Sequence, residues 1–195
     1  MKNRETYLTQ LTKKIEAEFF APLGLAMPEK WRVTCGFPSR NALGKARRTV
    51  GQNWAPQASA DGTNEIIISM TVGDVHQAAS ILAHEMIHAV IGNDKGHGKE
   101  FRKVAIAIGL TGKMTATVAG KEFTKRITPI IKKLGEYPHA ALDQQSRKKQ
   151  TTRMIKCECP SCGYVVRTSN KWINVAVPTC PDFDCDSHGE EMQIS

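Results

Sequence analysis

Apolar residues recur along the first two-thirds of the chain at the intervals of helices and strands. Spacings of three and four residues predict a helix over residues 4–20. Its apolar positions are Leu8, Leu11, Ile15 and Phe19. Residues 31–36 and 64–70 are short and rich in β-branched side chains, which predicts two strands. The basic, apolar-poor residues 38–51 between them are predicted as a hairpin or loop.

The most apolar predicted helix covers residues 75–91. Asp74 can cap its first turn, with Gln77 three residues further on as the partner in a capping box. Gly92 and Asn93 form a typical C-terminal stop. Because this helix follows a strand and is strongly apolar, we expect it to be buried in its domain.

Two further helices are predicted over residues 99–108 and 121–134. The first should stop at Gly109. Pro129 is expected to kink or break the second, because proline lacks an amide hydrogen. Helices grouped with a few strands indicate an α+β fold.

The character of the chain changes after the last of these helices. Residues 140–153 are polar and weakly periodic, which is typical of a linker. Residues 154–195 form a small cysteine-containing module, in which residues 164–168 and 171–177 resemble strands. The predicted organisation is a domain over residues 1–139, then the linker, then the module.

The charge is unevenly placed. The formal net charge is +8, and residues 30–60 contain no acidic residue. The basic residues of this stretch are Lys30, Arg32, Arg40, Lys45, Arg47 and Arg48. Such a stretch can bind phosphate or an acidic partner, or it can be a solvated basic surface.

Neither a secretory signal nor a membrane partner is expected. The first 20 residues are charged throughout and lack an apolar core. The longest apolar runs are far shorter than the roughly 20 residues that cross a bilayer. A cytoplasmic protein is the resulting expectation.

Residues 84–88 read HEMIH and lie within the predicted buried helix. Four residues return to within about 40° of the same direction on a helix, so His84 and His88 can bind one Zn²⁺ from one face. Glu85 lies beside the first ligand, where a carboxylate can reach a water molecule without binding the metal. This is the HExxH arrangement of zinc-dependent peptidases. A helix with two surface histidines is the alternative.

His97 is the leading candidate for a third ligand, since catalytic zinc normally takes three protein ligands and leaves one position open. It follows the predicted helix stop, so the chain can turn back before presenting it. Gly96 and Gly98 on either side permit unusual backbone angles. Asp94 and Glu100 are weaker alternatives.

Five of the six cysteines lie in the last 39 residues. Without a secretion signal, they are expected to bind metal as thiolates rather than to form disulfides. Two pairs separated by strand-like residues predict a zinc ribbon with one structural ion, whose ligands are Cys159, Cys162, Cys180 and Cys185. Cys157 could replace Cys159, and His188 could replace Cys185. Cys35 is expected to be a small buried residue.

The stretch from His84 to Phe101 resembles the SprT-like metallopeptidases, which include the Spartan proteases. The likeness is carried by HEMIHA, by Gly96-His97-Gly98 and by Glu100-Phe101, and it extends to the preceding strand and to the cysteine cluster. GFPSR and YPHAAL are similar to stretches of compact members encoded by phages and prophages.

This resemblance implies a zincin-like catalytic domain followed by a zinc ribbon. It implies one catalytic zinc on His84, His88 and His97, with Glu85 as the catalytic base. Tyr137 and His139 are possible donors to the oxyanion of the reaction, although closing the domain is the preferred interpretation of that stretch.

The resemblance also implies protein substrates that are bound or crosslinked to DNA. Expected DNA contacts are Arg40, Lys45, Arg47, Arg48, Arg167, Lys171 and Trp172. Two other hypotheses stay open. One is a peptidase that processes a phage or host protein without DNA, and the other is a non-enzymatic DNA-binding zinc protein. The intact Glu85 argues against the second, because a structural metal site needs no carboxylate there.

Overall fold

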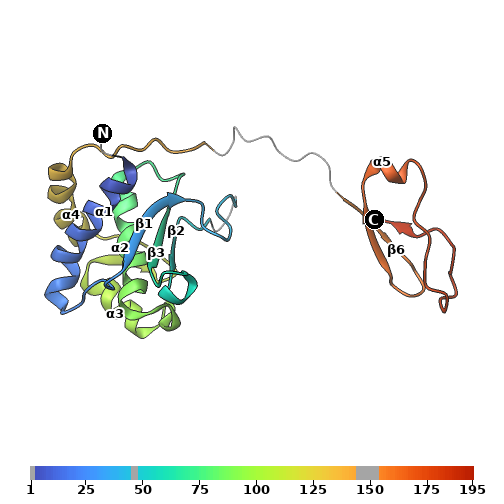
Figure 1. The fold of residues 1–195 in the computed structure, drawn as a ribbon, viewed down its shortest axis with the longest axis horizontal. Coiled ribbons are helices and arrows are strands. Elements are labelled where there is room, and N and C mark those ends of the chain that lie inside the picture. Colours follow the sequence, from blue (N-terminus) through green and yellow to red (C-terminus); the bar gives the residue numbers. More distant parts are fainter. Residues whose placement is uncertain (1–2, 45–47, 144–153) are drawn as a thin grey trace. The chain divides into compact units, whose positions relative to one another are not determined.

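The structure is a computed structural model that describes residues 3–44, 48–143 and 154–195. Helices and small sheets are mixed, as expected for an α+β protein, and they form two compact units, residues 1–145 and 146–195 (Figure 1). Most of the predicted linker lies outside the described residues, as do two of the expected DNA contacts, Lys45 and Arg47.

A three-stranded sheet lies on one side of the first unit (Figure 1). The central strand β3 (Asn64–Ser69) is parallel to β1 (Trp31–Gly36) and antiparallel to β2 (Gly51–Trp54). The strand order β1-β3-β2 makes β2 one edge of the sheet. The strand β2 was not predicted, because Gln52 and Asn53 interrupt any apolar alternation.

The two faces of this sheet differ in chemistry. Val33, Ile66 and Ile68 are buried in the hydrophobic core. The Arg32 side chain forms ion pairs with Asp61, at 3.0 Å, and with Glu65. The fold therefore neutralises one cation of the predicted basic stretch.

Helices cover the inner face of the sheet. The helices α1 (Arg4–Ile15) and α2 (Val75–Ile91) pack on the strands, α4 (Lys121–Leu134) packs on both of these helices, and α3 (Lys99–Ala107) packs on α2. Short π or 3₁₀ turns cover Glu16–Phe20, Ala21–Leu23, Pro56–Ala58 and Asn93–Lys95. Among the described residues, no helix has the length and apolar character needed to cross a membrane.

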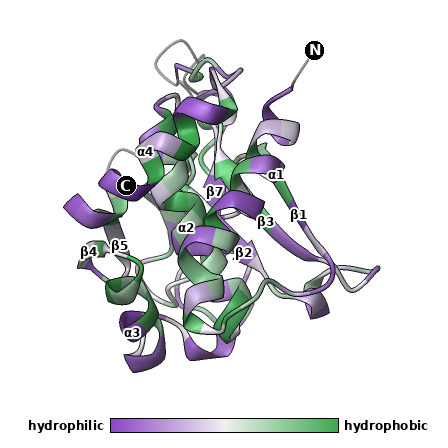
Figure 2. Ribbon diagram, turned by 90° about the vertical axis from the view of Figure 1, so that its left-hand side faces the viewer, coloured by the Kyte–Doolittle hydropathy of each residue, from purple (hydrophilic) through white to green (hydrophobic). Residues whose placement is uncertain are grey.

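The helix α2 begins and ends where its capping residues predict. Oδ1 of Asp74 accepts a hydrogen bond of 2.7 Å from the N–H of Gln77. At the other end, Gly92 has a φ of +94°, which favours glycine. Figure 2 shows hydrophobic residues along much of the helix, and Leu82 and Met86 are fully buried. Burial of these side chains holds the helix in the core.

The helix α4 runs through Pro129 without a break, so of the two predicted effects the break is wrong, while the kink stays a prediction. An internal proline costs a helix about 3 kcal/mol. This cost is opposed by burial of one face of α4 in the core. The buried residues of that face are Phe123, Ile127 and Ile131. Their burial offsets the lost hydrogen bond.

A hairpin of β4 (Leu110–Lys113) and β5 (Ala116–Ala119) follows α3 and packs on α2. The sequence did not predict it. Each strand has only four residues, and Leu110 is the only one of the eight that is fully buried. Such strands leave no apolar alternation to read.

The second unit contains a small sheet in the order β7-β6-β8, formed by Val165–Thr168, Ile155–Glu158 and Gln193–Ile194. The predicted strand over residues 171–177 is wrong, because this segment begins with the short helix α5 (Asn170–Ile173). The N–H of Ala176 donates to the carbonyl of Trp172, which continues the turn. Val175 is 74% exposed, so the β-branched residues that suggested a strand have no sheet to join.

Candidate metal centres

Three imidazole nitrogens converge beside α2. Nε2 of His97 lies 3.1 Å from Nε2 of His84 and 3.2 Å from Nε2 of His88. The helix spacing places His84 and His88 on one face. Gly92 then ends α2, and the turn Asn93–Lys95 brings the chain back so that His97 faces them.

The separations of these nitrogens fit a shared zinc ion. Zn–N bonds of about 2.0–2.1 Å at tetrahedral angles place ligand nitrogens roughly 3.3–3.4 Å apart. All three ligand atoms lie within 4.8 Å of one another. The weaker alternatives, Asp94 and Glu100, are outside this group, and Asp94 instead pairs with Lys95 at 3.4 Å.

Burial keeps the three histidines neutral. Burial, followed by the charges of the neighbouring histidines, lowers the pKa of His84 to about 3. Burial and the charge of His97 lower the pKa of His88 to about 4, and burial also lowers the pKa of His97. Near neutral pH each ring therefore retains a nitrogen lone pair that can bind a metal ion.

Thr117 on β5 forms a hydrogen bond with the ring of His84. Its Oγ1 lies 2.8 Å from Nδ1 of that ring. With Nδ1–H donating to the hydroxyl oxygen, the Nε2 lone pair is left to face the other histidines. Sequence reasoning missed Thr117, because it lies on the hairpin that the pattern did not predict.

The ring of Phe101 supports all three histidines from α3. Its centroid lies 4.8 Å from that of His84, 4.7 Å from that of His88 and 4.9 Å from that of His97. Phe101 is fully buried, so it forms an apolar wall that fixes the orientation of the imidazoles.

Glu85, which follows His84 on α2, is buried and is only 7% exposed. Burial raises the pKa of its carboxyl to about 8, while the backbone N–H of Asn53 on β2 acts in the opposite direction. A cation held by the histidines would favour the ionised carboxylate. Glu85 is thus a buried carboxyl group whose charge depends on its surroundings.

Gly51 provides the space that the Glu85 side chain occupies. A Cβ atom at this position of β2 would lie 2.5 Å from Oε1 of Glu85 and 2.5 Å from Cγ2 of Ile81. Real Cβ atoms essentially never approach other atoms so closely. The edge strand can therefore lie against the carboxylate only because residue 51 has no side chain.

A ladder of three asparagines ties β2 to the loop that carries His97. Nδ2 of Asn53 donates to Oδ1 of Asn93 at 2.8 Å, and Nδ2 of Asn93 donates to the carbonyl of Asn53 at 3.1 Å. Nδ2 of Asn64, a buried residue of β3, donates to Oδ1 of Asn53. The position of the third histidine is thus coupled to the sheet.

Four cysteines of the second unit also converge. The Sγ atoms of Cys159 and Cys185 are 3.7 Å apart, and those of Cys162 and Cys180 are 3.6 Å apart. A disulfide requires about 2.05 Å. Four Zn–S bonds of about 2.3 Å at tetrahedral angles place the sulfurs roughly 3.8 Å apart, so the group fits a zinc ion.

Backbone amides point at these sulfurs. The N–H of Ser187 donates to Sγ of Cys185 at 3.4 Å. The N–H groups of Cys162 and Ser161 lower the pKa of the Cys159 thiol, whereas burial and the neighbouring thiols raise the pKa of the Cys180 and Cys185 thiols. Thiolates this close together are therefore stable only with a cation between them.

The two alternative ligands of this group lie outside it. Cys157 is fully buried in the small core of the second unit. Nδ1 of His188 lies 3.1 Å from the carbonyl oxygen of Asp182, and the His188 ring stacks on Phe183. The structure brings together Cys159 and Cys185 instead.

A model of the SprT-like family matches residues 8–124, which is more than half of the chain. This chain belongs to the SprT-like family. The family is related to metallopeptidases, and the matched residues include α2, Glu85 and all three histidines. No curated protein and no solved structure gives a significant match to the chain.

The remaining candidate residues of this SprT-like protein are dispersed. The Tyr137 hydroxyl lies 3.5 Å from Sγ of the half-buried Cys35, and Nε2 of His139 lies 3.1 Å from the carbonyl of Met70. Neither belongs to the histidine group. The described candidates for DNA contacts are all exposed, namely Arg40, Arg48, Arg167, Lys171 and Trp172.

The Thr117→Val variant removes the hydroxyl that hydrogen-bonds to Nδ1 of His84 and keeps a β-branched shape. We expect the affinity of the histidine site for Zn²⁺ to fall about 10- to 100-fold, as for other hydrogen bonds that orient metal ligands. Competition with a chromophoric chelator measures this affinity. Thr117→Ser keeps the hydroxyl and is the matched control. Equal affinities in the two variants would show that the hydrogen bond does not support the site.

The Gly51→Ala variant places a methyl group against Glu85. We expect it to lower the free energy of unfolding of the first unit by about 1–3 kcal/mol, because the core must shift to admit the methyl group. Thermal unfolding followed by circular dichroism measures the loss. Gly36→Ala on β1 is the control, since its Cβ would meet only a methyl group of Ile67 at 3.3 Å. Similar losses in both variants would contradict the assigned contact.

Proposed function

We propose that this SprT-like protein is a zinc-dependent endopeptidase with a zincin-like catalytic unit. The observation that carries the proposal is the burial of Glu85, the residue after His84, on the helix that supplies two of three convergent histidines. A purely structural zinc site uses four protein ligands, whereas a catalytic one uses three and keeps a position open. The buried Glu85 carboxyl accepts a hydrogen bond from the backbone N–H of Asn53 but has no ion-pair partner among the described residues.

In the proposed hydrolysis, Glu85, the three histidines and Phe101 each have a separate role. When bound, zinc polarises a peptide carbonyl and lowers the pKa of a water molecule. Glu85 accepts a proton from the attacking water and passes it to the leaving amine. His84, His88 and His97 hold the metal, and Phe101 excludes water from one side of them.

The backbone of Gly51 on the edge strand β2 is proposed to bind the substrate backbone, since the N–H and carbonyl of Asn53 on the same edge are already bonded to Glu85 and Asn93. The N–H of Ser69 donates to the carbonyl of Val50 at 2.8 Å. Because hydrogen-bonded and non-hydrogen-bonded pairs alternate along antiparallel strands, the N–H and carbonyl of Gly51 point away from β3. An extended peptide can pair with such an edge. The contact between Gly51 and Glu85 would bring that peptide close to the base.

We also propose that the substrates are proteins bound or crosslinked to DNA. Support comes from membership of the SprT-like family, from the net charge of +8 and from the exposed Arg40 and Arg48. The second unit is proposed to be a structural zinc ribbon. It exposes Arg167 and also Trp172, whose ring carries the Lys171 ammonium 4.8 Å from its centroid. A cation and an aromatic ring suit a phosphate and a stacked base.

A peptidase that acts without DNA is the second candidate function. Ion pairing of Arg32 with Asp61 and Glu65 favours it, because this removes one cation from the predicted basic stretch. A non-enzymatic zinc protein is disfavoured by Glu85, whose burial costs free energy that a structural site does not require.

The Glu85→Gln variant tests the proposed chemistry. A DNA-binding protein serves as substrate, alone and with single-stranded or double-stranded DNA, and cleavage is followed by gel electrophoresis. We expect Glu85→Gln to retain zinc and to cleave about 10²- to 10⁴-fold more slowly, because the amide cannot accept the proton. Glu29→Gln, which changes an exposed carboxylate in the same way, should cleave like the wild type.

The outcomes separate the candidate functions. An unchanged cleavage rate in Glu85→Gln would rule out the catalytic role. Cleavage that is the same with and without DNA would favour the second candidate. We expect DNA to accelerate cleavage and salt to weaken this effect, since phosphate contacts are lost as salt rises.

A further inference from the structure

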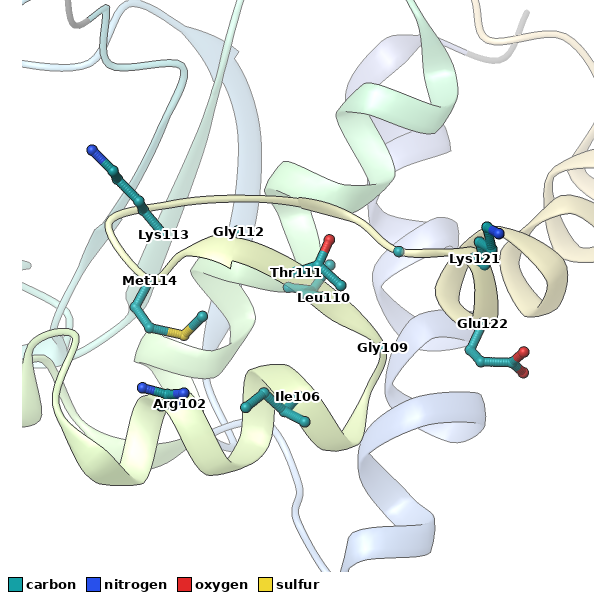
Figure 3. Close-up of a pocket in the computed structure, with 11 residues that line it drawn as sticks. Arg102, Ile106, Gly109, Leu110, Thr111, Gly112, Lys113, Met114, Lys121 and Glu122 are labelled. Atoms are coloured by element: carbon teal, nitrogen blue, oxygen red, sulfur yellow. The ribbon is translucent and has the colours of Figure 1, made fainter.

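A cavity of about 500 Å³ opens between α3, the β4–β5 hairpin and the start of α4 (Figure 3). Its apolar lining consists of Ile106, Leu110 and Met114, and its charged lining consists of Arg102, Lys113, Lys121 and Glu122. Figure 3 shows Arg102 and Ile106 on α3 facing the hairpin, with Met114 pointing toward Arg102. The volume is within the usual range for ligand pockets.

The cations of this cavity have no ionic partner among the described residues. Elsewhere in the first unit, some arginines form ion pairs within the fold. Arg126, for example, pairs with Glu18 at 3.0 Å. Arg102, Lys113 and Lys121 make no such contact within the part of the chain that the structure describes. Their charges are therefore available to an anionic group of a ligand.

The floor of the cavity selects for an apolar group as well. Ile106 is 56% exposed and lines the cavity together with Leu110 and Met114, so an apolar surface is open to a ligand. Aliphatic residues flanked by unpaired cations complement a large apolar side chain flanked by carboxylates. Nucleic acid fits less well, because no described lining residue is aromatic and could stack on a base.

The cavity shares its walls with the histidine site. On α3, Phe101 supports the histidines while its neighbour Arg102 lines the cavity. On the hairpin, Thr117 bonds to His84 while its cross-strand partner Gly112 lines the cavity. A peptide bound here would be held by the same two elements that position the metal ligands.

We propose that this cavity is an exosite that binds an acidic peptide segment with a large apolar side chain, carried by the protein substrate. The assignment to a substrate rests on the proposed peptidase function. Binding of the peptide does not, since it requires no cleavage.

Fluorescence anisotropy of a labelled peptide tests the exosite. The probe has one leucine flanked on each side by two aspartates, and the protein is the full chain carrying Glu85→Gln, so that nothing is cleaved. We expect Arg102→Glu to weaken binding about tenfold or more, because it reverses a charge that faces the ligand. Ile106→Ser, and the same peptide with serine in place of leucine, should also bind more weakly.

Lys103→Glu is the matched control, because it reverses the next exposed cation on the same helix outside the cavity lining. It should bind the peptide like the parent. Equal losses in Arg102→Glu and Lys103→Glu would overturn the exosite in favour of general charge attraction, and absence of binding to the parent would overturn it outright. Binding of oligo(dT) that depends on Arg102, with peptide binding that does not, would mark a nucleic-acid surface instead.

The two proposals fail separately in this design. If peptide binding depends on Arg102 and Ile106 but the wild-type protein cleaves no substrate, the binding site is supported and the proposed peptidase function is rejected. If cleavage depends on Glu85 but no peptide binds at the cavity, the peptidase function is supported and the exosite is rejected.

Discussion

The first unit is organised around the convergence of three neutral imidazoles, of which His84 and His88 are largely buried and His97 is exposed. Their Nε2 atoms lie 3.1 and 3.2 Å from that of His97. Lone pairs at such separations repel one another unless a cation or shared protons lie between them. Burial lowers the pKa of each histidine and so disfavours protons. A metal ion is therefore the natural partner of the site, and the surrounding fold serves to keep these rings together.

Three segments that are distant in sequence hold the rings and the carboxylate in place. Thr117 fixes one ring from the hairpin, Phe101 supports all three from α3, and Asn53 ties the sheet to the loop before His97. Gly51 leaves space for Glu85. The HExxH helix supplies the reactive groups, but their geometry depends on elements that the motif does not contain.

The helix α2 could be predicted to the residue, because Asp74 and Gly92 are local signals and a helical period places His84 and His88 together. The SprT-like family could also be named from these residues. In contrast, β2 and the hairpin are short and largely polar, so Gly51 and Thr117 could not be assigned roles. Their importance arises from non-local contacts with α2. In the second unit, cysteine spacing indicated the ligand group, whereas alternating β-branched residues gave a false strand at α5.

Zinc content tests the central claim most directly, namely that the histidines and the cysteines each hold one metal ion. Elemental analysis should find about two zinc ions per wild-type chain, about one in His88→Ala and about one in Cys180→Ser. The ion that remains in Cys180→Ser should have nitrogen and oxygen ligands by X-ray absorption. Two zinc ions per chain in His88→Ala, or sulfur ligands alone in the wild type, would contradict the account.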